Sequence, residues 1–494
     1  MGVIKSQSIY STIISYVGVI IGFVTSALIM PKVLTADQLG LVKLIVAVTG
    51  VFASVFSFGI RQVLNRTYPL YENTPDKLAR LFYLSIKIAL FGGIVALPIY
   101  YLTAFDVFNF DRTIPDFNKS NFFIHAVFVA IIFRILYLSL FGYVRMMSQI
   151  VIDSIIQNVF LKGGILIFIL FYFFEIITFD GFVYAHIVLY LFFPLIIILY
   201  LLKNKKFPLY PKKTRFAASE LREFFNLSLF GVLTTIGTSL YIYLDTLMVN
   251  FYLSESDVGI YGTMFLFGII VAVPARGMKE ISISVLSKAY NEDRFDEIDN
   301  VYKKSSMTLF LVGVFIFLGV YTNLYSVFEY LPHEFRQGTY VVLFIGLAQL
   351  TDMLCGVNYE IIASSKHYRL NTWFTLAAIV SAIILNMLFI PVYGISGAAF
   401  ATLSSVFLVN FFRIIAVWKI FKIQPFTSKT IWALVVSTVF YIILVSIPTI
   451  EQPILNLLVK GVLLVILFLP TIYFLKLSED INGIIDRFLK LNKS

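Results

Sequence analysis

Residues 182–202 read FVYAHIVLYLFFPLIIILYLL, a run of 21 residues without an acidic, lysine or arginine side chain. A helix needs roughly 20 mainly apolar residues to cross ~30 Å of hydrocarbon, because it rises about 1.5 Å per residue. Lipid offers no hydrogen-bonding partner to irregular backbone, so such a segment crosses a membrane as a helix. Residues 182–202 therefore predict one transmembrane helix.

The same pattern recurs along the whole chain. Apolar residues make up 59% of the 494 residues and charged residues 13%, about half the charged fraction of a typical soluble domain. This predicts an all-α integral membrane protein with about 14 transmembrane helices, as counted on the ~20-residue requirement. The expected spans are residues 8–30, 41–60, 81–102, 121–144, 151–172, 182–202, 224–249, 259–274, 307–325, 340–362, 371–392, 397–417, 431–447 and 453–475.

The net charge of +10 is distributed unevenly across the membrane. Four of the 38 Lys and Arg residues lie in segments on one side, namely Lys32, Arg112, Lys119 and Arg336, whereas most of the others lie on the opposite side. Cytoplasmic loops carry the excess of basic residues in membrane proteins. We therefore expect both termini in the cytoplasm and an even number of spans, and the basic charge gives no reason to expect nucleic-acid binding. A single cysteine, Cys355, leaves no intramolecular disulfide and no cysteine metal cluster.

Two halves of the chain resemble each other. Residues 34–41 (LTADQLGL) and 253–260 (LSESDVGI) share Leu, a hydroxyl residue, a Gly and flanking aliphatic residues, and residues 181–185 and 397–401 form a second pair. Transporters built from repeats bind substrate between them. We expect an N-terminal lobe over 1–202, a cytoplasmic linker over 203–222, a C-terminal lobe over 223–418, two appended spans over 429–476 and a cytoplasmic tail over 477–494.

Polar segments outside the spans are short. Residues 276–304 are rich in charge, which predicts a short amphipathic helix on the inner surface or a solvated linker. The longest outer loop covers about residues 103–120. The first helix of each lobe also carries small and polar residues at three- and four-residue steps, which would serve either a hydrated cavity or close helix packing.

Four segments carry a family resemblance: residues 15–41, Phe58-Gly59-Ile60-Arg61, residues 283–306, and residues 386–402 (NMLFIPVYGISGAAFAT). On these the sequence resembles the polysaccharide flippases of the multidrug/oligosaccharidyl-lipid/polysaccharide exporter superfamily. The resemblance implies a multidrug-and-toxin-extrusion-like fold that moves isoprenoid-diphosphate-linked oligosaccharide, with undecaprenyl as the lipid, from the cytoplasmic to the outer face of the bacterial inner membrane. It implies alternating access, membrane lipids as surroundings, and glycosyltransferases and a polysaccharide polymerase as partners in O-antigen, capsule or exopolysaccharide assembly.

Charged residues inside the expected spans point to the site. An ionisable residue at the bilayer centre costs roughly 2.5–3.5 kcal/mol on the mild insertion scale. Arg134 lies ~20 Å from the outer end of its span and Lys162 ~17 Å from the inner end of its span at 1.5 Å per residue, so neither reaches water easily. The candidate substrate-binding cations are Arg134, Lys162, Arg61, Arg276 and Lys87. Lys87 lies close enough to its inner helix end to reach the interface, and Arg61 and Arg276 lie at inner helix ends, where they could serve topology alone.

Acidic residues fall in later spans. Asp245, Asp352 and Glu360 are the candidates for ion coupling or gating, and either a proton or sodium would be the coupling ion; no other cofactor is expected. The alternative is a set of interhelical salt bridges, with Arg134 to Asp352 the first pair to consider. On this reading cations cluster in the first lobe and acids in the second.

Two other functions compete with flipping. A multidrug extruder of the same superfamily usually has fewer spans, and the cations of the first lobe oppose a cationic drug. A membrane enzyme that uses lipid-linked sugar generally needs a large catalytic loop, and the longest outer loop is too short for one. We therefore expect a transporter and not an enzyme.

Overall fold

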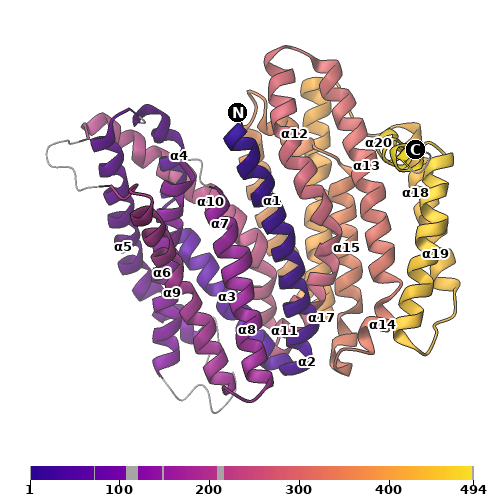
Figure 1. Cartoon of the computed structure of the whole chain (residues 1–494), viewed down its shortest axis with the longest axis horizontal. Helices are drawn as coiled ribbons and strands as arrows, with labels where there is room; N and C mark the ends of the chain where they lie inside the picture. The colour runs from indigo at the N-terminus through magenta and orange to yellow at the C-terminus, as the bar shows by residue number, and fades with distance from the viewer. Residues whose placement is uncertain (1, 72, 107–120, 147–149, 209–215, 492–494) are drawn as a thin grey trace. The chain divides into compact units, whose positions relative to one another are not determined.

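The computed structural model describes residues 2–71, 73–106, 121–146, 150–208 and 216–491, and this part of the chain contains helices and no strands. The chain divides into two compact units, residues 1–259 and 260–494, each a bundle of long helices (Figure 1). The expected outer loop at 107–120 and part of the linker, 209–215, lie outside the described residues.

Unit 1 is a helix bundle in which α6 packs against α3, α4, α5 and α9, and α10 packs against α3 and α4. Its elements are α1 (Gly2–Phe23), the π-helix η1 (Val24–Ile29), α2 (Met30–Val33), α3 (Ala36–Phe56), α4 (Ile60–Tyr71), α5 (Pro75–Asp106), α6 (Asn121–Met146), α7 (Ile150–Ser154), the π-helix η2 (Ile155–Leu161), α8 (Lys162–Phe173), α9 (Phe179–Lys203) and α10 (Ala218–Tyr252).

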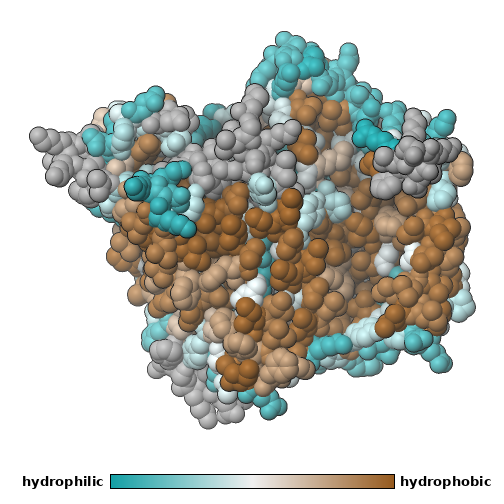
Figure 2. Space-filling view, viewed as in Figure 1, coloured by the Kyte–Doolittle hydropathy of each residue, from teal (hydrophilic) through white to brown (hydrophobic). Residues whose placement is uncertain are grey.

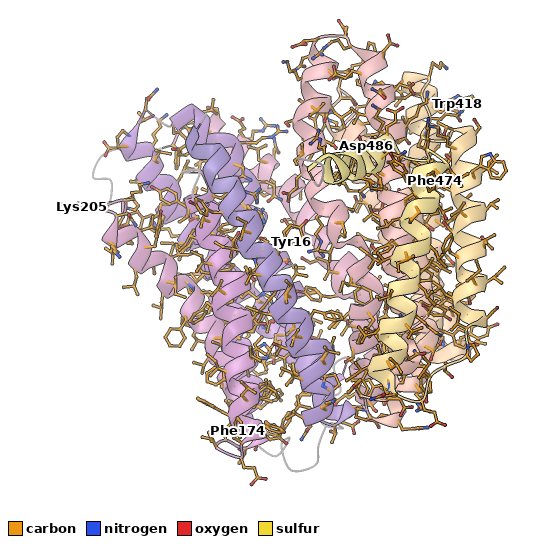
Figure 3. All side chains as sticks on the ribbon, turned by 45° about the vertical axis from the view of Figure 1, so that its right-hand side comes forward. Tyr16, Phe174, Lys205, Trp418, Phe474 and Asp486 are labelled. Carbon is orange, nitrogen blue, oxygen red and sulfur yellow. The ribbon has the colours of Figure 1, made fainter. Side chains whose placement is uncertain are left out.

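Unit 2 contains most of α11, which starts at the end of unit 1, and the remaining helices. They are α11 (Glu255–Ile269), η3 (Ile270–Ala272), α12 (Val273–Asn291), α13 (Phe295–Tyr321), α14 (Leu324–Phe328), η4 (His333–Gly338), α15 (Thr339–Leu354), α16 (Asn358–Ala363), α17 (Arg369–Phe421), α18 (Ser428–Ser446), α19 (Pro453–Phe474) and α20 (Glu479–Leu491). The last helix, which carries Asp486, runs crosswise to α19 near the end that carries Phe474 (Figure 3) and also contacts α13.

The expected membrane character is confirmed. Eleven helices of the described residues are long and apolar enough to span a membrane. One of them, α17, covers two expected spans. Its backbone leaves the helical region between them at Gly394, which has a φ of 58°. The expected spans 224–249 and 340–362 correspond to α10 and to α15 with α16. Apolar side chains cover the middle of the helices, and hydrophilic ones gather at their ends (Figure 2).

One expected element is wrong. Residues 276–304 do not form a separate surface helix: α12 continues the preceding apolar helix to Asn291, and α13 begins at Phe295. A turn with Asp293 at a φ of 53° separates the two helices. The polar residues of this segment therefore belong to the ends of two long helices, where ion pairs such as Lys303 to Asp299 at 2.5 Å cover one helix face.

The repeated motif starts a helix in both places. Thr35 caps α3 in a capping box with Gln38, and Ser254 and Asp257 bond each other in the same way at the start of α11, with Asp257 N–H donating to Ser254 Oγ at 3.2 Å. The glycines of the two motifs bring these helix starts into close contact. A Cβ on Gly40 would lie 1.9 Å from the Glu255 carbonyl oxygen, and no side chain fits there.

Gly40→Ala should therefore destabilise the protein by about 1–3 kcal/mol, the usual cost of overpacking. The matched control is Gly163→Ala, because Gly163 lies in helix α8 and a Cβ there meets nothing within 4 Å; this change should stabilise the helix by roughly 0.5–1 kcal/mol. Thermal unfolding of the two purified variants in detergent measures the difference. Equal melting temperatures would show that the two helix starts are not held together.

Candidate functional site

Arg134 sits in the interior of unit 1, on α6, where its guanidinium forms hydrogen bonds with two other helices and contacts an aromatic ring of a third. It donates to Thr49 Oγ1 at 2.8 Å and to the Val46 carbonyl at 3.2 Å, both on α3, and to the Tyr243 hydroxyl of α10 at 3.4 Å. It also lies 5.2 Å from the ring centroid of Tyr190 on α9. An arginine that is half buried among four helices is thus held in one orientation.

The partners of Arg134 are neutral. Among the described residues of unit 1 no carboxylate lies within salt-bridge distance of its guanidinium. A cation of this kind keeps its full charge in a low-dielectric interior, where it attracts an anion far more strongly than in water. The planar guanidinium can donate two parallel hydrogen bonds to a phosphate.

Lys162, on α8, contacts η2 and α1. Its Nζ donates to Asn158 Oδ1 at 2.9 Å, and its aliphatic chain lies against Gly22 of α1. Asn158 in turn lies against Gly18, so the small residues of α1 serve close packing against η2. The π-helical turn ends immediately before Lys162, and π-helical turns are frequent at functional sites.

Arg61, Lys87, Asp245 and Arg276 lie on four different helices. Arg61 is half buried on α4, with its guanidinium 5.6 Å from the ring centroid of Phe141. Lys87 on α5 and Arg276 on α12 are exposed. Asp245 is buried on α10, which belongs to unit 1 and not to the second compact unit. Within unit 1, Arg134 and Arg61 therefore lie against different aromatic rings and Lys87 is exposed, while Arg276 belongs to unit 2.

Unit 2 holds a half-buried pair of opposite charges. Lys279 Nζ of α12 lies 2.5 Å from Asp352 Oδ2 of α15, and the two side chains are 20% and 32% exposed. Asn410 of α17 donates to Asp352 Oδ1 at 3.3 Å and accepts from Asn358 of α16 at 2.9 Å. The carboxylate is thus saturated by a cation and an amide from two other helices.

Glu360 lies next to this pair. It is 6% exposed, and its Oε2 has no hydrogen-bond partner in the described part of the chain. Lys279, Asp352 and Arg413 are near enough to act on it electrostatically, and Arg413 stacks over the Tyr359 ring at 5.2 Å. Acids and bases therefore occur together in unit 2, contrary to the expected separation of cations in one lobe from acids in the other.

Sequence reasoning missed four residues of this cluster. Lys279 was counted with the basic residues of the inner surface, and Arg413, Asn358 and Asn410 were not singled out. The signal was present, since Arg413 and both asparagines are polar residues inside expected spans.

Three comparisons with known proteins bear on this arrangement. A family model described as "Polysaccharide biosynthesis protein" matches residues 4–273. A relative from Haloferax volcanii, the "Probable low-salt glycan biosynthesis flippase Agl15", is 24% identical over 190 residues, which cover 38% of this chain and 40% of that relative. The aligned part thus spans less than half of the relative's length.

Solved structures share the fold over most of the chain. The lipid II flippase MurJ in an inward closed conformation matches with a TM-score of 0.64 at 15% identity, covering 94% of this chain and 99% of the other. An inward-facing multidrug resistance MATE family transporter matches with a TM-score of 0.61 at 13% identity, covering 83% and 94%. These likenesses confirm the expected all-α, multidrug-and-toxin-extrusion-like membrane fold.

Proposed function

Because the chain belongs to the polysaccharide biosynthesis protein family that matches residues 4–273, we propose that it flips isoprenoid-diphosphate-linked oligosaccharide from the cytoplasmic to the outer face of a cell membrane by alternating access. The observation that carries the proposal is Arg134, a cation in the membrane interior whose partners in the described residues are all neutral. A diphosphate is the anion that its geometry suits.

The proposal assigns different tasks to the two units. Arg134 meets the diphosphate or an acidic sugar in unit 1, and Lys162 adds a second, mobile positive charge. In unit 2, Asp352 and Glu360 exchange the coupling ion, a proton or sodium, with Lys279 and Arg413 balancing their charge. A bound proton or cation would stabilise a buried carboxylate that has an oxygen without a hydrogen-bond partner, as Glu360 has.

Location and partners follow from the same proposal. The protein works in the bacterial inner membrane with both termini in the cytoplasm, because the basic residues concentrate on that side. Glycosyltransferases build its substrate on the cytoplasmic face, and a polysaccharide polymerase consumes the flipped product. The transported lipid is the undecaprenyl type.

Deleting the gene tests the proposal. We expect surface polysaccharide to disappear and lipid-linked oligosaccharide to accumulate on the cytoplasmic face, where an impermeant sugar oxidant applied to spheroplasts cannot reach it. A plasmid copy of the gene should restore both properties. Normal surface glycan in a deletion strain without a second flippase would contradict the proposal. Glycosyl transfer by the purified protein would instead favour an enzyme.

A further inference from the structure

A hollow of about 560 Å³ opens at one end of unit 1. Its walls come from α2 on one side and from the end of α8 and the turn into α9 on the other. The volume falls within the ~300–1,000 Å³ range of small-ligand sites. The lining residues are Lys32, Val33, Tyr172, Phe173, Glu175, Ile176, Ile177 and Thr178.

The hollow belongs to the outer end of the unit. Residues 31–40 and 173–181 connect spans on the side that carries few basic residues, which is the outer side by the positive-inside rule. Phe174 at the turn lies at the opposite end of the helices of unit 1 from Lys205 in the basic linker (Figure 3). A molecule that has crossed the membrane would meet this hollow on arrival.

The turn between α8 and α9 fixes the side chains that line the hollow. Ile176 N–H bonds the Phe171 carbonyl at 2.9 Å, and Glu175 N–H bonds the Tyr172 carbonyl at 3.0 Å. Glu175 occupies the left-handed position that ends α8, with a φ of 59°, where glycine is usual. Thr178 caps α9 by accepting from Gly181 N–H at 3.2 Å.

The aromatic wall is equally fixed. The Tyr172 ring centroid lies 6.3 Å from that of Phe179 and 6.4 Å from that of Phe182, so the tyrosine is held by the start of α9. Tyrosine presents an apolar ring face with a polar hydroxyl at its edge. Val33 and Ile177 extend the apolar part of the lining.

This lining combines the groups that a sugar ring requires. Lys32 supplies hydrogen-bond donors, Glu175 supplies acceptors and Thr178 supplies both, beside apolar surface that suits the C–H faces of a pyranose. The Glu175 carboxylate would repel a phosphate, and the Lys32 ammonium would repel a metal cation, so the lining suits a neutral sugar better than either ion. We propose that this hollow binds a sugar residue of the flipped glycan on the outer side of the membrane, an inference that rests on the proposed function.

The test uses the full-length protein in nanodiscs and, as probe, the soluble oligosaccharide that mild acid releases from the lipid-linked pool of the deletion strain. Binding is followed by saturation-transfer difference NMR. We expect the Lys32→Gln/Glu175→Gln double variant to bind the oligosaccharide about tenfold more weakly, the loss expected for one charge-assisted hydrogen bond. Both side chains are exposed, so the variant should keep its melting temperature.

Two further variants separate this inference from the proposed function. The control Arg336→Gln/Glu451→Gln, whose residues lie in unit 2 and do not line the hollow, should bind as the wild type does. Arg134→Ala should lose export yet still bind the released oligosaccharide. Equal binding by the double variant and the wild type, or no binding by a wild type that exports normally, would overturn the sugar site and leave the flippase intact. Binding with normal surface glycan in the deletion strain would contradict the flippase alone.

Discussion

Arg134→Ala should lower glycan export by about 100-fold while the protein remains in the membrane. The estimate corresponds to roughly 3 kcal/mol, the upper value for a hydrogen bond to a charged group. Because neutral groups hold the guanidinium, its removal strands no buried carboxylate among the described residues. We therefore expect the loss of this charge to reduce substrate export more than it reduces protein stability. Export per molecule, from surface glycan and membrane abundance together, measures the effect.

Conservative variants sharpen this prediction. Arg134→Lys keeps the charge but loses the planar fork, so it should retain part of the activity. Tyr243→Phe removes the longest of the hydrogen bonds, at 3.4 Å, and should change export little. Arg66→Ala is the control, because Arg66 is an exposed arginine of the same unit. A fall in abundance or melting temperature for Arg134→Ala, with normal export per remaining molecule, would assign Arg134 to structure alone.

The membrane fold was predictable because hydrocarbon thickness fixes the length of each apolar block. The expected spans 371–392 and 397–417 meet at Gly394, where the backbone leaves the helical region, so the break was visible as a glycine between two blocks. The segment 276–304 was misjudged for a related reason. Apolar length indicates where a helix enters water and not where it ends, and α12 and α13 continue beyond the apolar part with polar residues.

The site was predictable only in part. The depth of Arg134 follows from counting residues along one span, whereas its partners Thr49, Tyr190 and Tyr243 come from helices remote in sequence. The pairing of Asp352 with Lys279 inside unit 2 was not predictable either, because partner selection depends on how helices pack. Lys279 could have been considered from the sequence, because it lies close to the candidate Arg276. Only the packing of α12 shows that its side chain points to Asp352.

Lys279→Met should destabilise the protein strongly, and adding Asp352→Asn should restore most of the loss. Removing one partner of a fully buried pair costs about 3–5 kcal/mol, whereas replacing both partners by neutral groups is often harmless. Because this pair is 20% and 32% exposed, we expect about 1–3 kcal/mol, the usual cost of an unsatisfied polar group. The pair lies 2.5 Å apart, and Asn410 remains as a hydrogen-bonding partner for the new amide. Melting temperature and membrane abundance of the two singles and the double measure the effect.

The pair Lys303–Asp299 provides the matched control. It has the same 2.5 Å separation and side chains that are 39% and 28% exposed, but it joins positions i and i+4 of a single helix, where an ion pair contributes about 0.3–0.5 kcal/mol. Lys303→Met should therefore cost little, and Asp299→Asn should rescue nothing. If Lys279→Met lowers the free energy of unfolding no more than Lys303→Met does, the Lys279–Asp352 pair does not stabilise the fold. If the Lys279→Met/Asp352→Asn double variant regains abundance but exports no glycan under an ion gradient, Asp352 serves ion coupling. If the double variant regains both abundance and export, the pair serves the fold. Glu360 is then the remaining carboxylate that could carry the ion.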